Sequence, residues 1–192
     1  MRLIPTDLPG VVIVEPTVFA DDRGWFAETF NAPRFDAALE ALGLPRPGAF
    51  VQDNHSCSAA GVLRGLHYQL PPHAQGKLVR VVQGAAFDVA VDIRRRSATF
   101  GHWVGVELTA ANRRQVWIPP GFAHGFVALV DDTHFLYKTT DVYASACERS
   151  LRWNDPALGI AWPLAPGVAP RLAPKDVAAP LLHAAEVFDH QA

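Results

Sequence analysis

Residues 116–129, VWIPPGFAHGFVAL, are the stretch that decides which fold this chain adopts. Two apolar runs, rich in β-branched and aromatic residues, flank Pro119, Pro120 and Gly121. Prolines and glycines in this position turn the chain sharply between two strands. His124 opens the second run, which gives the spacing P-x-G-x-x-H. The stretch therefore predicts a strand, a tight corner and a second strand that begins with a histidine.

Most of the remaining chain consists of similar short runs. Several of them alternate apolar and polar residues, and Gly, Pro, Asp or Asn separates one run from the next. The expected strands cover residues 11–19, 24–30, 49–56, 62–70, 77–83, 85–93, 102–108, 114–119, 124–130 and 134–143. About ten strands in about 140 residues predict an all-β fold, an antiparallel sandwich or barrel. The length of 192 residues suits a single domain over residues 1–192.

Two segments depart from the strand pattern. Residues 32–42 carry apolar side chains at helical spacing, with Asn31 as N-cap and Gly43 after the last turn, and they predict a helix. Residues 163–192 begin with a proline-rich stretch and predict a C-terminal wrap around the body. A short helix is expected within this wrap, at residues 181–187.

Composition limits the possible partners and the compartment. The 17 Lys and Arg residues nearly balance the 19 Asp and Glu residues, which argues against a nucleic-acid-binding surface. Cys57 and Cys147 lie far apart without a CxxC partner, so reduced thiols are expected rather than a disulfide framework. No window approaches the roughly 18 apolar residues of a membrane helix, and the first residues lack a signal-peptide pattern. We expect a soluble, cytoplasmic protein without membrane contact.

A second histidine lies in LRGLHY, residues 63–68. His67 can be a packed core residue, a metal ligand or a catalytic base. The P-x-G-x-x-H stretch resembles the second motif of the cupin superfamily, whose fold is a small jelly-roll barrel with a site inside. Metal-binding cupins also have a His-x-His motif followed by a glutamate, but here Gln69 follows His67 and Lys77 lies nearby. Because a metal needs three or four converging donors and a lysine repels it, no metal is expected.

A histidine and a lysine in a metal-free barrel suit proton abstraction next to a ketone. The base needs a pKa near neutrality, which His67 would provide. Lys77 would hold the enolate oxygen as negative charge develops on it. On these two residues alone the interpretation stays open, because a single histidine in an apolar strand is more often a core residue and a single lysine is usually solvated.

The chain as a whole resembles the dTDP-4-dehydrorhamnose 3,5-epimerase family, which consists of metal-free, cofactor-free cupins. The resemblance rests on VFADDRGWFAETF, FVQDNHS, VLRGLHYQ, AQGKLVR, FDVAVDIRRRSATFGHWVGV, WIPPGFAHGF, FLYKTTDVY, LRWNDPALGIAWP and APKDVAAPLL. It implies a cupin-type jelly roll. It also implies inversion of C3 and C5 of dTDP-4-keto-6-deoxy-D-glucose, which gives dTDP-4-keto-6-deoxy-L-mannose for dTDP-L-rhamnose synthesis. The alternative is a C5-only or C3-only epimerase acting on another dTDP-4-keto-6-deoxy sugar.

The resemblance also implies the catalytic residues. His67 matches the base, and Asp176 matches the carboxylate that orients it. Lys77 matches the residue near the C4 oxygen. Tyr137 matches the acid that reprotonates carbon from the opposite face, as inversion requires.

Substrate binding is implied for a larger set. The diphosphate would be held by arginine side chains, since the chain has no P-loop and no GxGxxG between a strand and a helix. The positions that match are Arg23, Glu28, Gln52, Asn54, Arg64, His124, Glu148 and Lys175, with Asp53 inside the matched segment and Phe26 as a support for the thymine ring.

Family members form homodimers that share an N-terminal strand region, so Arg23, Phe26 and Glu28 are expected to serve the partner's site. One departure from the family pattern is Val142, which replaces the first of two adjacent tyrosines in many members. Tyr137 is unaffected by this change.

Overall fold

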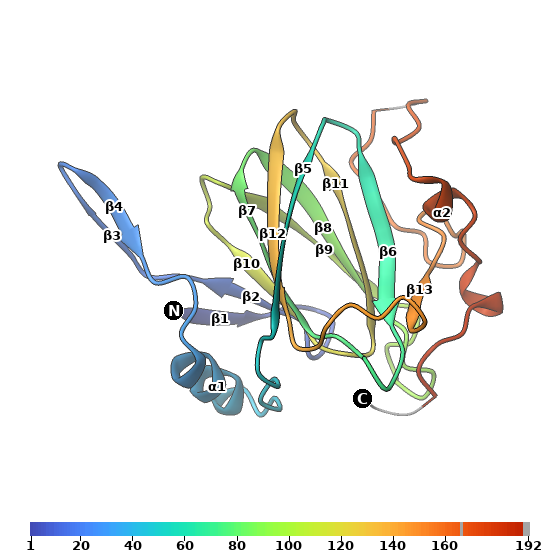
Figure 1. Ribbon diagram of the computed structural model, residues 1–192, viewed down its shortest axis with the longest axis horizontal. Helices are drawn as coiled ribbons and strands as arrows, with labels where there is room; N and C mark the ends of the chain where they lie inside the picture. The colour runs from blue at the N-terminus through green and yellow to red at the C-terminus, as the bar shows by residue number, and fades with distance from the viewer. Residues whose placement is uncertain (166, 190–192) are drawn as a thin grey trace.

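The computed structural model describes residues 1–165 and 167–189, and in them strands dominate (Figure 1). Six strands form one antiparallel sheet in the order β1-β2-β10-β7-β12-β5. Their bounds are Arg2–Pro5 for β1, Val12–Glu15 for β2, Gln115–Ile118 for β10, Lys77–Gln83 for β7, Thr133–Thr139 for β12 and Gln52–Ser58 for β5. The prediction of an all-β fold with few helices is confirmed.

The second sheet has five strands in the order β13-β6-β11-β8-β9, and all its neighbours are antiparallel. The bounds are Glu148–Ser150 for β13, Leu63–Gln69 for β6, Phe122–Ala128 for β11, Ala85–Asp92 for β8 and Trp103–Thr109 for β9. The 116–129 stretch forms β10, the turn and β11. Because β10 belongs to the first sheet and β11 to the second, this corner carries the chain from one sheet to the other.

An apolar core fills part of the space between the sheets. Alternate side chains of each strand point inward, as the two-residue period of a strand requires. Val79 and Phe135 of the first sheet pack against Ala90, Leu108 and Phe126 of the second. The Phe126 and Phe135 rings are stacked with centroids 4.0 Å apart, so they join the two sheets at the centre of the molecule.

A separate hairpin projects from the body, as Figure 1 shows in blue. It consists of β3 (Val18–Asp21) and β4 (Gly24–Ala27). Phe19 and Phe26 are exposed to 63 % and 68 % in the single chain. The prediction of one strand over residues 11–19 is wrong in detail, because these residues belong to two strands. β2 ends at Glu15, and the next residue, Pro16, has no N–H to donate to a sheet.

The predicted helix is present as α1 (Ala32–Ala41), one residue shorter than expected. The Asn31 side chain accepts a hydrogen bond from the Arg34 N–H, and Phe35 and Leu39 are buried. Phe35 packs edge-on against Trp117 of β10, which fixes the helix against the outer face of the six-stranded sheet.

The C-terminal segment covers the outer face of the five-stranded sheet. Leu158, Val187 and Phe188 pack there with Leu66 and Tyr68 of β6. The short helix expected at residues 181–187 is one 3-10 turn, η1 (Leu182–Ala184), and α2 (Pro174–Val177) was not predicted. Residues 190–192 of the expected wrap lie outside the described part. Among the described residues, no helix is both long and apolar enough to cross a membrane.

Candidate active site

A cavity of about 720 Å³ opens between the two sheets beside the aromatic core. Strands of both sheets and the segment before α2 form its walls. All four predicted catalytic residues line it, together with six predicted binding residues: Gln52, Asn54, Arg64, His124, Glu148 and Lys175. Residues as distant in the chain as 52 and 176 therefore meet in one space.

His67 and Asp176 form a hydrogen-bonded pair on one wall. His67 lies on β6, and its Nε2 is 2.6 Å from Asp176 Oδ1. Asp176 is 1 % exposed and belongs to α2, whose first residue is Pro174. Proline favours the first turn of a helix. A buried carboxylate at this distance fixes the ring orientation and stabilises the imidazolium once the ring accepts a proton.

Lys77 lies beneath this pair at the beginning of β7. Its Nζ donates a hydrogen bond to the His67 carbonyl at 3.3 Å, and the residue is 8 % exposed. Burial lowers the Lys77 pKa to about 8, since a charged amine is costly to remove from water. Near neutral pH, Lys77 therefore remains a cation although it is buried in the cavity wall.

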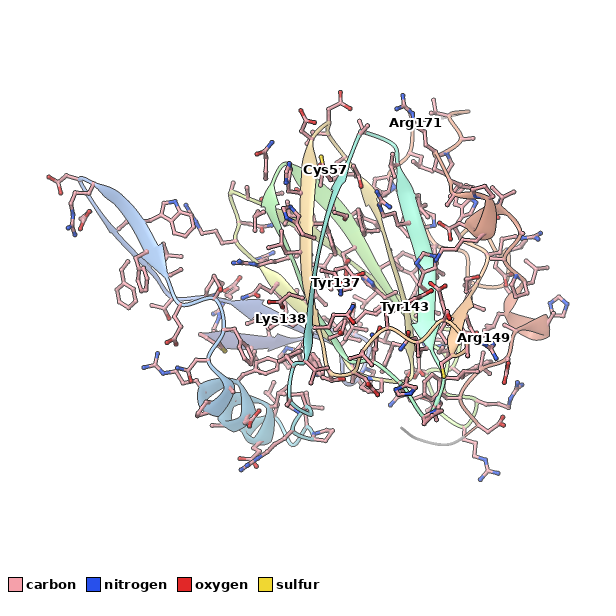
Figure 2. All side chains as sticks on the ribbon, in the orientation of Figure 1. Cys57, Tyr137, Lys138, Tyr143, Arg149 and Arg171 are labelled. Atoms are coloured by element: carbon pink, nitrogen blue, oxygen red, sulfur yellow. The ribbon has the colours of Figure 1, made fainter. Side chains whose placement is uncertain are left out.

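Tyr137 faces His67 from the other sheet. It lies on β12, where Figure 2 labels it near the middle of the view. Burial raises the pKa of its phenol, so the hydroxyl keeps its proton at neutral pH. A group that can accept a proton and a group that can donate one thus line opposite walls of the same cavity.

His124 forms a second buried pair behind the first. It lies directly across from His67 on β11, and its Nε2 is 2.7 Å from Asp88 Oδ2 of β8. Burial lowers the His124 pKa, which keeps the ring neutral at neutral pH. Asp88 was not predicted, although an acid in the middle of the apolar run AAFDVAV, residues 85–91, is a signal for a buried polar partner.

Polar side chains at one end of the cavity hold one another in place. Glu148 accepts a hydrogen bond from Lys175 Nζ at 2.7 Å and one from the Tyr143 hydroxyl at 3.1 Å. Gln52 accepts from the Tyr143 N–H and donates to Asn54. These contacts give the cavity an ordered set of donors and acceptors, as a specific polar ligand requires.

Some cavity residues were not predicted. They include Gln69, Gln75, Tyr143 and Arg171. Asp88, which was also not predicted, does not line the cavity itself. Gln69 donates to the Val142 carbonyl and accepts from the Ala144 N–H, so it anchors the loop that follows β12. Val142 is exposed and is not among the residues that line the cavity, whereas Tyr143 lines it.

Four predicted binding residues do not line this cavity. Asp53 alternates with Gln52 and Asn54 on β5, so it faces the outer side of the sheet and pairs with Lys138 at 2.8 Å. Arg23 pairs with Asp21 in the projecting hairpin, and exposed Phe26 lies on the same hairpin.

Glu28 follows this hairpin. Its carboxylate pairs with Arg34 of α1 at 2.9 Å. Within residues 1–165 and 167–189, no group of three or more His, Cys, Asp or Glu side chains is placed to hold a metal ion.

Comparison with known proteins identifies the family of the chain. The family model of dTDP-4-dehydrorhamnose 3,5-epimerase matches residues 5–184. The chain is 55 % identical to the enzyme of that name from Shigella flexneri, over 92 % of this chain and 93 % of that one. The one from Pseudomonas aeruginosa is 57 % identical over 92 % and 93 % of the two chains.

Solved structures give the same result. A dTDP-6-deoxy-D-glucose-3,5-epimerase from Legionella pneumophila, in complex with dTDP-4-keto-L-rhamnose, has a TM-score of 0.90 and 48 % identity, with 100 % and 99 % of the chains covered. A 3′-monoepimerase from Streptomyces bikiniensis, in complex with dTDP-quinovose, has a TM-score of 0.83 and 37 % identity over 95 % and 88 % of the chains. The resemblance inferred from the sequence is confirmed, and the chain belongs to the dTDP-4-dehydrorhamnose 3,5-epimerase family.

Proposed function

We propose that this protein inverts C3 and C5 of dTDP-4-keto-6-deoxy-D-glucose and yields dTDP-4-keto-6-deoxy-L-mannose for dTDP-L-rhamnose synthesis. The observation that supports this most directly is the placement of His67 and Tyr137 on opposite walls of one cavity. Inversion requires a base on one face of the sugar and an acid on the other. Retention would result if a single group removed and returned the proton on the same face.

The reaction at each carbon is a proton removal followed by a proton delivery. His67 removes the proton, which the neighbouring C4 ketone acidifies, and Asp176 stabilises the imidazolium at 2.6 Å. Negative charge moves to the C4 oxygen, where the Lys77 ammonium stabilises the enolate. One such preorganised group typically contributes about 3–4 kcal/mol to the transition state.

Tyr137 then delivers its proton to the opposite face of the carbon. After this step His67 carries an extra proton and Tyr137 has lost one, so both groups must exchange protons with solvent before the next inversion. The hydrogen that enters the sugar therefore comes from water, which makes the proposed reaction visible as isotope exchange.

The remaining cavity residues support binding of the nucleotide. Gln52, Asn54, Glu148 and Lys175 offer both donors and acceptors to a nucleotide base and sugar, and Arg64 offers a guanidinium to the diphosphate. Asp53 has no support as part of this cavity, since its side chain faces the other side of the sheet.

We also propose that residues 1–192 act as one jelly-roll domain within a homodimer. The hairpin carrying Arg23 and Phe26 stands away from its own cavity, and its exposed aromatic side chains suit burial against a second copy. In this arrangement Arg23, Phe26 and Glu28 complete the partner's site.

The free thiols of Cys57 and Cys147 fit a reducing cytoplasm.

Isotope exchange followed by NMR tests the function. In deuterated solvent, the protein should introduce deuterium at both C3 and C5 of dTDP-4-keto-6-deoxy-D-glucose. His67→Asn should abolish exchange at both carbons, whereas His102→Asn, an exposed histidine outside the cavity, should retain it. Full exchange by His67→Asn would contradict the assignment of the base.

A mono-epimerase is the second candidate, favoured by the similarity to the 3′-monoepimerase from Streptomyces bikiniensis. Deuterium at one carbon alone would support it against the 3,5-epimerase.

A further inference from the structure

Arg171 lines the cavity although neither the motifs nor the catalytic scheme gives it a task. It lies on the extended segment before α2, is exposed, and lines the cavity together with Arg64 and Lys175. In the described part of the chain, its guanidinium has no hydrogen bond or ion pair. Figure 2 shows it at the end of the molecule where β5 leads into β6, the end that also carries Cys57.

The backbone of Arg171 is held firmly against the beginning of β6. Its N–H donates to the Gly61 carbonyl at 2.8 Å, and its carbonyl accepts from the Leu63 N–H at 3.0 Å. These bonds form a parallel bridge in which Arg171 pairs with Val62. Paired residues point to the same face of a sheet, and residues two apart on a strand share that face. Arg171 and Arg64 therefore project from the same face, and both reach the cavity.

The cations that line the cavity are not equally available to a ligand. Lys175 is neutralised by Glu148 at 2.7 Å. Arg64 donates its Nε to Ser58 and one Nη2 hydrogen to the Cys57 carbonyl, both neutral groups, so its positive charge is uncompensated. Arg171 adds a second uncompensated guanidinium on the same face. Two planar forks side by side match the oxygens and the negative charges of a diphosphate better than one.

We propose that Arg171 binds the diphosphate of the sugar nucleotide together with Arg64. This inference rests on the proposed function, because the proposed substrate supplies the diphosphate. The contact is remote from the reacting carbons, so it stabilises the bound substrate and the transition state equally. A group of this kind lowers KM without changing kcat.

Kinetics and calorimetry on the full-length protein test this role. Arg171→Gln should raise KM and the Kd for dTDP by about tenfold, the usual effect of losing one hydrogen bond to a charged group, and leave kcat nearly unchanged. Arg171→Lys keeps the charge but not the fork, so its Kd should lie between those of Arg171→Gln and the wild type. Added salt should weaken dTDP binding less in Arg171→Gln than in the wild type. Arg96→Gln removes an exposed arginine away from the cavity and should behave like the wild type.

Two outcomes would overturn the inference, and they differ. If the wild type binds dTDP and Arg171→Gln binds it within twofold as tightly, Arg171 is a surface cation only, and the proposed function stands. If the wild type neither binds dTDP nor exchanges solvent deuterium into the substrate, the proposed function and the role of Arg171 fail together.

Discussion

Burial has opposite consequences for the two proton-carrying residues next to His67. It lowers the pKa of Lys77 to about 8 and raises the pKa of Tyr137, because it disfavours the charged form of each. At neutral pH the cavity therefore holds a cationic lysine and a protonated phenol. These are the forms that enolate stabilisation and proton donation require.

The Lys77 pKa predicts the alkaline limit of activity. As pH rises through about 8, Lys77 loses its proton and the C4 oxygen loses its cation, so kcat/KM should fall. Lys77→Arg should be less active at pH 7 because the guanidinium differs in shape from the ammonium, but its profile should lack this fall, since arginine stays charged up to a pH of about 12. A pH profile of kcat/KM checks this. An identical alkaline limb in Lys77→Arg would assign the limb to another group.

The lowered pKa of Lys77 also makes the free energy of unfolding depend on pH. Between pH 8 and 10.5, Lys77 is protonated in the unfolded chain but largely neutral in the folded protein. The unfolded state then binds more protons, so the free energy of unfolding due to this group rises with pH over that window. The rise is about 3 kcal/mol in total, from a shift of 10.5 to about 8. Urea unfolding at several pH values should show it in the wild type, whereas Lys77→Met should lack it.

Tyr137→Phe should separate proton exchange from inversion. The variant keeps His67 and Lys77, so the substrate can still lose a proton to the base and form the enolate. Without the phenol, His67 exchanges the proton it has taken for a solvent deuteron and returns that deuteron to the face the proton left. NMR in deuterated solvent should thus show deuterium entering with retained configuration and little epimerised product. Complete loss of exchange would mean that Tyr137 takes part in proton removal as well.

The sequence pointed to His67, Lys77, Tyr137 and Asp176, which line one cavity, only through the family resemblance. No spacing rule connects His67 with Asp176, because 109 positions separate them and the fold alone brings them to 2.6 Å. Arg171 carried no signal at all, since an arginine in a proline-rich stretch looks like an ordinary surface residue. Its approach to the cavity depends on a bridge to Val62 that local sequence does not encode.

At the scale of elements, the distance between β6 and β11 depends on Gly125. A Cβ at this position would lie 2.7 Å from the Arg64 carbonyl and 3.1 Å from the Gly65 Cα. These are backbone atoms, which cannot move aside without separating the strands that carry His67 and His124. Gly125→Ala should lower the free energy of unfolding by about 1–3 kcal/mol, as overpacking does. It should also reduce kcat.

Urea unfolding of Gly125→Ala and of a matched control checks the prediction. Gly48→Ala is suitable, because its added Cβ meets only Thr140 Cβ at 3.9 Å, an ordinary contact. This control should be as stable as the wild type or slightly more stable. If the two variants had the same free energy of unfolding, the close approach of β6 and β11 at Gly125 would not contribute to stability.

The elements differed in how readily the sequence predicted them. Long alternating runs such as those of β7, β8 and β12 were expected within a few residues of their bounds. The missed strands, β1 and β13, have four and three residues and form through pairing with β2 and β6 rather than through their own pattern. α2 spans four residues beginning with a proline, which is too short for a helical period to show.

At the scale of the whole molecule, a single chain leaves its aromatic hairpin exposed. Trp25 of β4 packs against the Arg113 guanidinium at 4.5 Å, which fixes the direction of the hairpin. Phe19 and Phe26 on the same hairpin remain more than half exposed. An extended ribbon with exposed aromatic side chains is suited to packing against a second copy rather than to its own barrel.

Subunit complementation tests whether the hairpin serves the partner's site. His67→Asn disables the cavity of its own chain, and the double variant Arg23→Ala, Phe26→Ala disables only what its hairpin contributes. Each homodimer should be nearly inactive. In a heterodimer, the cavity with His67 receives the intact hairpin of the His67→Asn chain. Random pairing of the two chains should thus restore about one quarter of wild-type activity, since half the dimers then hold one intact site.

A matched pair of variants makes the complementation result specific. His67→Asn co-produced with Tyr137→Phe should restore nothing, because both residues line the cavity of their own chain and each heterodimer then holds two defective cavities. Sedimentation should give a mass of about twice 20.9 kDa for the wild type. A fully active monomer would contradict the shared site. So would a hairpin variant with wild-type activity, because Arg23 and Phe26 would then have no part in either cavity.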